Sequence, residues 1–191
     1  GVPALGHEFM LAKLAWLREH EPLAWAKSRR LCLLSDYLTL LLTGQHVTEA
    51  GTAGLTGLVD LEKATWFDSM LQAWQVDRDW LPRIVRAGTD LGPLARSAAQ
   101  RFGLPPTCHF VVGCLDQYCG PIGLGALGGD CIAETTGTVL ATVRAASGPS
   151  REAPAALFQG CGYRPGIVWQ MSFGSVSANY LQWYRDLLAD Q

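Results

Sequence analysis

The pattern of apolar and polar positions predicts a chain in which short helices alternate with strands. Apolar residues recur every three or four positions in several segments, which is typical of amphipathic helices. These segments are residues 9–19, 36–43, 66–75, 94–102, 117–127 and 177–191. Gly44 follows the second segment and is expected to end that helix, because glycine adopts the left-handed conformation of a helix C-terminus at little cost.

Short apolar runs bounded by turn residues predict strands. They cover residues 31–34, 108–112, 132–135, 139–143 and 166–173. The run at 108–112, CHFVV, follows a Pro-rich turn and is apolar enough to be a central strand of a sheet. Residues 47–61 are rich in Gly, Thr, Ala and β-branched residues, which indicates extended chain and turns.

Composition supports a folded protein and excludes some partners. Of 191 residues 49% are apolar and 17% charged, so the chain can bury a core. A formal charge of -2 gives no basic surface for nucleic acid or an anionic membrane. No apolar run approaches the ~18 residues that span a bilayer. We therefore expect neither nucleic acid nor a membrane as a partner.

Six cysteines occur without a CxxC pair. A zinc site made by Cys108, His109, Cys114 and Cys119 is one alternative, but the spacing differs from that of common zinc motifs. Free thiols are the favoured interpretation, with no metal ligands assigned. Such thiols fit a reducing compartment, so we expect a cytoplasmic protein.

The pattern changes at Gly128-Gly129-Asp130, a glycine-rich turn after which strands predominate. We expect a domain boundary there, between residues 1–128 and residues 129–191. The last helix has an apolar face and no following element to cover it. The chain is therefore expected to be an internal piece of a larger two-domain protein.

Two features point to chemistry. Asp116 follows an apolar strand, which is where α/β sheets place ligand-binding groups. The alternative is that Asp116 only caps the next helix. Gly137 and Thr138 form a turn whose N–H and hydroxyl donors suit phosphate oxygens. An ordinary surface turn is the alternative there. Together the two features suggest phosphoryl transfer in a cleft between domains.

The chain resembles the FGGY family of carbohydrate kinases. The resemblance rests on successive stretches that occur in the family's order: KLAWLREHEP, LLSDYLTLLLTG, DLEKATWFDSML, LPRIVRAGTDLGPL, GLPPTCHFVVGCLDQ, ETTGTV and LQWYRDLL. It implies an α/β fold of the ribonuclease H-like (actin-like ATPase) kind, with two domains and a cleft between them. It also implies transfer of the γ-phosphoryl group of ATP, with Mg²⁺, to a hydroxyl of a sugar or polyol.

The resemblance also implies roles for individual residues. The family's Gly-x-x-Asp stretch falls on GCLDQ, so Asp116 would be the general base, and Gln117 would bind substrate hydroxyls. Gly137 and Thr138 would hold the β- and γ-phosphates, and Gln182 would lie near the adenosine. Val139 and Ala178 replace smaller residues of the family's pattern. Glu8 stands where glycerol kinases have a Tyr and would bind a longer sugar.

We therefore predict a kinase acting on a small-molecule sugar or polyol, such as a pentulose or another ketose. A non-catalytic nucleotide-binding or scaffolding member of the actin-like superfamily is the main alternative. A hydrolase is disfavoured, because no Gly-x-Ser-x-Gly elbow occurs. A homodimer is an open alternative for the assembly. The family's first phosphate loop and its adenine-binding segment are missing, so residues 1–191 alone are not expected to turn over ATP.

Overall fold

The computed structural model describes residues 7, 9–137, 140–154, 157–174 and 177–189. Its helices are α1 (Met10–His20), α2 (Pro22–Lys27), α3 (Leu34–Thr43), α4 (Ala50–Gly54), α5 (Asp68–Trp74), the 3-10 turn η1 (Arg78–Trp80), α6 (Arg96–Phe102), α7 (Asp116–Gly123) and α8 (Ala178–Ala189). Its strands are β1 (Val47–Glu49), β2 (Val59–Asp60), β3 (Thr65–Trp66), β4 (Arg83–Val85), β5 (Asp90–Pro93), β6 (His109–Val111), β7 (Ala133–Thr136), β8 (Leu140–Ser147), β9 (Phe158–Cys161) and β10 (Ile167–Gly174).

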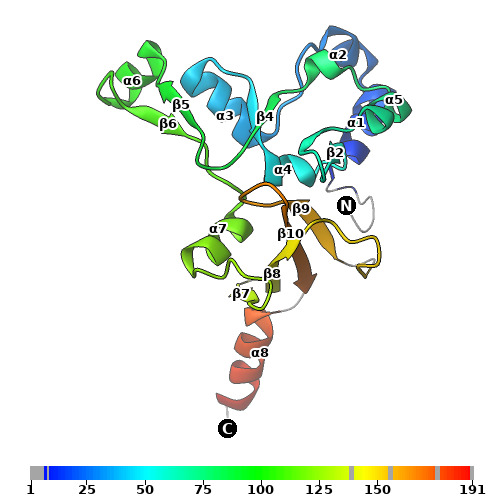
Figure 1. The fold of residues 1–191 in the computed structure, drawn as a ribbon, viewed down its shortest axis with the longest axis vertical. Coiled ribbons are helices and arrows are strands. Elements are labelled where there is room, and N and C mark those ends of the chain that lie inside the picture. Colours follow the sequence, from blue (N-terminus) through cyan, green and yellow to red (C-terminus); the bar gives the residue numbers. More distant parts are fainter. Residues whose placement is uncertain (1–6, 8, 138–139, 155–156, 175–176, 190–191) are drawn as a thin grey trace.

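The elements up to β6 form a first part of helices and two-stranded pairs (Figure 1). β1 pairs in parallel with β4, whereas β2 with β3 and β5 with β6 are antiparallel. A core of buried side chains joins α1, α4 and α5, and it includes Leu11, Leu14, Ala53, Leu58, Trp66 and Leu71. The Trp66 indole N–H donates to the Pro82 carbonyl oxygen at 2.8 Å, so the ring is buried without an unpaired donor.

The second part is a four-stranded antiparallel sheet in the order β7-β8-β10-β9. Along β8, Ala141, Val143 and Ala145 are buried at alternate positions, as expected for a strand with one face on a core. The Tyr118 ring of α7 stacks on Trp169 of β10 with ring centroids 5.5 Å apart. α7 thus covers the sheet, while α8 extends away from its far end (Figure 1).

The two parts meet where α4 packs against β9 (Figure 1). Glycines make this contact close: a Cβ on Gly54 would lie 3.2 Å from the Cα of Gly160. The Arg86 guanidinium donates to the Gly162 carbonyl oxygen across the same junction at 3.0 Å. At Gly54 and Gly160 the junction is therefore backbone packed on backbone, and a charged hydrogen bond joins the two parts nearby.

Most of the predicted helices are confirmed, with ends displaced by up to a few residues. Gly44 follows α3 with φ 75°, the left-handed conformation predicted for it. The strand predicted at residues 31–34 is wrong: Leu31 N–H donates to the Trp80 carbonyl oxygen, and Leu34 begins α3. Within residues 47–61, predicted as extended chain and turns, the short helix α4 was missed.

The strand predicted at residues 108–112 is confirmed as β6, but its predicted central position in a sheet is wrong. β6 pairs with β5 in a two-stranded sheet, and Val111 is 55% exposed. In the second part, the strand expected at residues 132–135 is confirmed as β7, and the one expected at 166–173 as β10. β9 was missed, because residues 158–161 follow a long polar segment and hold only four positions. Among the described residues, no helix combines the length and the apolar character needed to cross a membrane.

Candidate active site

Asp116 is the first residue of α7, and a link of four residues, 112–115, joins it to the end of β6 at Val111. Its side chain is exposed, and Oδ1 accepts a hydrogen bond from the Gln117 backbone N–H at 2.7 Å. The residue before the helix is Leu115, so Asp116 is the first helical residue rather than the N-cap. The carboxylate is thus fixed to the helix start and remains accessible to a hydroxyl group.

Gln117 lies half-buried beside it. Its Oε1 atom is buried and has no hydrogen-bond partner among the described residues. A buried carboxamide oxygen without a partner costs free energy, commonly about 1–3 kcal/mol. Gln117 therefore holds a buried acceptor whose hydrogen-bonding capacity is unused in the part of the chain that the structure describes.

The residues expected to contact ATP follow β7. A Cβ on Gly120 of α7 would lie 3.8 Å from Thr135 Oγ1, so α7 runs beside β7, and Gly137 comes directly after that strand. The Gly137 carbonyl oxygen accepts from the Ala178 N–H at 3.0 Å, which ties this bend to the start of α8. Gln182 lies exposed on α8. The structure thus links α7, the bend at Gly137 and α8 by successive contacts.

Two of the expected site residues, Glu8 and Thr138, lie outside the described residues, as does Val139. Asp116 and Gln117 lie together at the start of α7. Gly137 and Gln182 belong to the second part of the chain.

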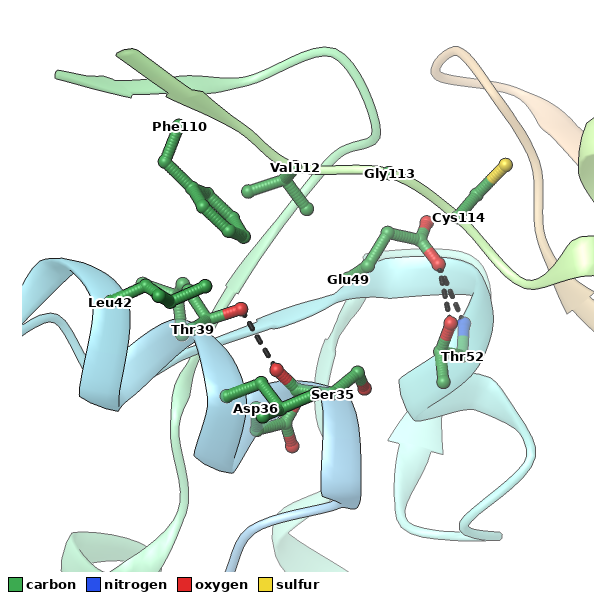
Figure 2. Close-up of a pocket in the computed structure, with 12 residues that line it drawn as sticks. Ser35, Asp36, Thr39, Leu42, Glu49, Thr52, Phe110, Val112, Gly113 and Cys114 are labelled. Carbon is green, nitrogen blue, oxygen red and sulfur yellow. Dashed lines mark hydrogen bonds between the residues drawn. The ribbon is translucent and has the colours of Figure 1, made fainter. Parts of the chain in front are cut away.

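A cavity of about 270 Å³ opens next to the link that leads to Asp116 (Figure 2). It lies between α3, β1, the start of α4 and the end of β6. Its wall is mostly apolar, with a few hydroxyl and carboxyl groups; the lining residues are Ser35, Asp36, Leu38, Thr39, Leu42, Val47, Glu49, Thr52, Phe110, Val112, Gly113 and Cys114. Since Gly113 and Cys114 belong to the wall, the cavity comes within two residues of Asp116.

Two buried carboxyl groups face this cavity, and the sequence analysis missed both. Asp36 Oδ2 accepts from the Leu33 N–H at 2.9 Å. Glu49 caps α4: Oε1 accepts from Gly51 N–H at 2.8 Å. Its Oε2 atom accepts from the N–H and the hydroxyl of Thr52 at 2.8 and 2.9 Å (Figure 2). The sequence signal for Glu49 is an acid directly before a run of small residues that begins a helix.

Burial shifts the proton equilibria of both acids. Desolvation raises the pKa of Asp36 and that of Glu49 above the usual carboxyl range, although backbone hydrogen bonds act in the opposite direction. These hydrogen bonds show that both carboxyl groups cap a helix N-terminus, that of α3 for Asp36 and that of α4 for Glu49. Their first role is therefore structural, and they hold the cavity wall in place.

The residues of the alternative zinc site do not converge. His109 Nδ1 lies 2.8 Å from Asp90 Oδ2, on the exposed pair β5 and β6. Cys114 Sγ and Cys119 Sγ lie 2.9 Å apart. Within the part of the chain that the structure describes, no three His, Cys, Asp or Glu side chains are placed to hold one metal ion.

Comparison with known proteins gives the family. The model of the FGGY family of carbohydrate kinases, N-terminal domain, matches residues 5–123. The xylulose kinase of Lactococcus lactis is 29% identical over 178 residues, which are 93% of this chain and 35% of that protein. The autoinducer-2 kinase of Salmonella typhimurium is 27% identical over 176 residues, 92% of this chain and 33% of that protein. The chain thus spans about a third of the length of these relatives.

Solved structures show the same fold at low identity. The ligand-bound xylulose kinase from Lactobacillus acidophilus superposes with a TM-score of 0.89 at 22% identity, covering 97% of this chain and 38% of that one. Plasmodium falciparum glycerol kinase with ADP gives a TM-score of 0.80 at 16% identity, covering 95% and 37%.

The architecture is that of a sugar-kinase-type α/β protein with the actin-like ATPase fold, as the sequence predicted. The chain belongs to the FGGY family of carbohydrate kinases.

Proposed function

We propose that the complete protein is an ATP-dependent kinase that phosphorylates a hydroxyl group of a sugar or polyol. A ketose such as a pentulose is the proposed substrate class, since a xylulose kinase is among the relatives and Glu8 offers an acceptor for an additional hydroxyl. We place the domain boundary at residues 128–129, so that residues 1–128 carry the substrate side and residues 129–191 begin the nucleotide side.

The observation that carries the proposal is the exposed Asp116 carboxylate at the start of α7, inside the region that matches the family's N-terminal domain. A sugar hydroxyl is a weak nucleophile near neutral pH. A carboxylate that accepts its proton while holding it in line supplies both orientation and general base catalysis. We assign these roles to Asp116, and we assign substrate binding to Gln117, whose Oε1 lacks a partner among the described residues.

Residues that follow α7 in the chain carry groups that suit a bound nucleotide. Phosphate oxygens accept hydrogen bonds, so the group that Gly137 offers to them is its backbone N–H. The Gly137 carbonyl oxygen accepts from Ala178 N–H, which holds the bend against the start of α8. Gly137, Thr138 and Gln182 would hold ATP, which when bound supplies the γ-phosphoryl group. Mg²⁺ commonly binds through substrate phosphates and one or two carboxylates, so a dedicated cluster of protein ligands is not required.

The test is a panel of pentuloses, hexuloses and polyols offered with Mg-ATP to the complete protein and to its Asp116→Asn variant. We expect turnover of at least one sugar by the wild type and a kcat lower by about 10²- to 10⁴-fold in the variant, with ATP binding retained. Asp130→Asn, at an exposed aspartate beyond α7, is the matched control and should keep its activity.

Two outcomes of this test would contradict the proposal. Unchanged turnover in Asp116→Asn would reject the assigned base. ATP binding without turnover of any sugar would instead favour the alternative, a nucleotide-binding or scaffolding protein.

A further inference from the structure

Two cysteines enclose the start of α7. Cys114 lies in the link after β6, and Cys119 lies in α7 one helical turn beyond Leu115, to whose carbonyl oxygen the Cys119 N–H donates at 3.0 Å. This backbone bond brings the Cys119 side chain back over the link. The two Sγ atoms lie 2.9 Å apart, and Cys119 Sγ also lies 3.6 Å from the Cys114 carbonyl oxygen. The thiols therefore touch, and the segment between them contains Asp116 and Gln117.

The four remaining cysteines have other surroundings. Cys32 Sγ contacts His46 Nε2 at 3.3 Å, and Cys161 is buried. Cys108 Sγ contacts the His109 carbonyl oxygen at 3.9 Å, while Cys131 is exposed. In the part of the chain that the structure describes, no second pair of cysteine sulfurs lies in hydrogen-bond contact. The contact between their two sulfur atoms thus distinguishes Cys114 and Cys119 from the other described cysteines.

We propose that Cys114 and Cys119 form a thiol–disulfide exchange site, which low-molecular-weight disulfides oxidise to an intramolecular disulfide. A protein disulfide has an S–S bond of about 2.05 Å, so closing it requires the sulfurs to approach by less than about 1 Å. A rotation of the exposed Cys119 side chain can supply such a movement. This proposal concerns a modification of the chain and does not depend on the kinase function.

The two thiols have different parts in the exchange. Cys119 is exposed, whereas Cys114 is half-buried. Burial and, after it, the contact with Cys119 together raise the pKa of the Cys114 thiol to about 12, so Cys114 keeps its proton near neutral pH. Attack on an external disulfide therefore begins at Cys119.

The reaction balances without another oxidant. The Cys119 thiolate attacks one sulfur of the external disulfide RSSR, which forms a mixed disulfide at Cys119 and releases the first RSH. Cys114 then gives its proton to solvent base as its sulfur attacks Cys119 Sγ and displaces the second RSH. The protein loses two hydrogen atoms, and RSSR is reduced to two RSH.

The test uses the complete protein and oxidised glutathione, and it reads mass rather than activity. After alkylation of free thiols under denaturing conditions, trypsin leaves residues 102–144 as one peptide that holds Cys108, Cys114, Cys119 and Cys131. Chymotrypsin is therefore required, because cleavage after Leu115 or Tyr118 separates Cys114 from Cys119. We expect fragments that remain joined through these two residues and lack two hydrogen atoms, and that separate on reduction.

Matched variants assign each step. Cys114→Ser should stop at a mixed disulfide with glutathione on Cys119. Cys119→Ser should give no cross-link, and Cys114 should react at least about tenfold more slowly than Cys119 does in Cys114→Ser. Cys131→Ser, which removes an exposed thiol outside the pair, should still form the cross-link.

Two results would overturn the proposal. One is a wild-type protein that keeps glutathione on Cys119 without cross-linking to Cys114. The other is a cross-link that joins a different pair of cysteines. Both readouts come from the unmodified wild-type sequence, so they stand even where a variant folds poorly, and neither depends on whether the protein phosphorylates a sugar.

Discussion

The Tyr118 hydroxyl group occupies the space that a side chain at Gly160 would need. A Cβ added to Gly160 would lie 2.5 Å from Tyr118 Oη, and one added to Gly51 would lie 3.0 Å from the same ring. Tyr118 itself is fully buried and stacks on Trp169. The tyrosine of α7 therefore fills the junction between α4 of the first part and β9 of the second.

Gly160→Ala is expected to lower the free energy of unfolding by about 1–3 kcal/mol, because the added methyl group overpacks this junction. Denaturant unfolding of the complete protein measures the effect. Gly123→Ala in α7 is the control, since a Cβ there would meet no atom within 4 Å; its stability should be unchanged or slightly higher.

Tyr118→Phe should recover part of the loss in Gly160→Ala. The substitution removes the oxygen nearest to the added methyl group, and that oxygen has no hydrogen-bond partner among the described residues. A double-mutant cycle measures the coupling. Additive effects of the two substitutions would show that the contact between Tyr118 and Gly160 does not limit packing.

Gln117→Ala in the complete protein is expected to raise KM for the sugar about tenfold, which corresponds to about 1.4 kcal/mol, with a smaller change in kcat. The reason is that the unpartnered Gln117 Oε1 is assigned to the bound substrate in both ground and transition states. Steady-state kinetics separate the two parameters. Gln100→Ala, at an exposed glutamine of α6, is the control. A lower kcat at unchanged KM would contradict a binding role.

Glu49 should make the free energy of unfolding decrease as pH rises, whereas carboxyl groups with a lowered pKa do the reverse. Its pKa is raised by burial in the folded state from an ordinary value of 4.5, so between these two values the folded chain binds more protons than the unfolded chain. Its contribution to the free energy of unfolding is complete below the ordinary pKa and decreases as pH rises through the folded pKa.

The measurement is the difference in unfolding free energy between Glu49→Gln and the wild type, from about pH 5 to about pH 8. The variant loses part of the α4 cap but never carries the buried charge. Its stability relative to the wild type should therefore improve as pH rises. Glu62→Gln is the control at an exposed carboxyl group. A difference that stays constant over this range would contradict the argument.

Local signals in the sequence predicted much of the fold. Gly44 ended a helix as expected, because the left-handed conformation at a helix end is a local requirement. The position of the strand at 108–112 within a sheet was predicted wrongly, because it depends on contacts with distant segments. An apolar run does not show how many strands pair with it, and β6 has one partner. α4 was missed because five small residues carry no helical periodicity, and its cap, Glu49, acts through its position alone.

The sequence selected some residues of the candidate site and missed others. The motif around GCLDQ selected Asp116 and Gln117 as candidates, and the two lie together at the start of α7; their roles stay predictions. The contact between Cys114 and Cys119 was not predicted, because it depends on how the link after β6 turns into the helix. The buried acids Asp36 and Glu49 were not selected either, since burial is set by packing between distant segments.

The stacking of Tyr118 on Trp169 offers a label-free optical signal. The two rings are nearly parallel, with 19° between their planes, and both are buried. Aromatic rings held in a fixed asymmetric setting give near-ultraviolet circular dichroism, which disappears when the setting loosens. Loosening of the seam between α7 and the sheet would therefore be visible in that band even while far-ultraviolet spectra still report intact helices and strands.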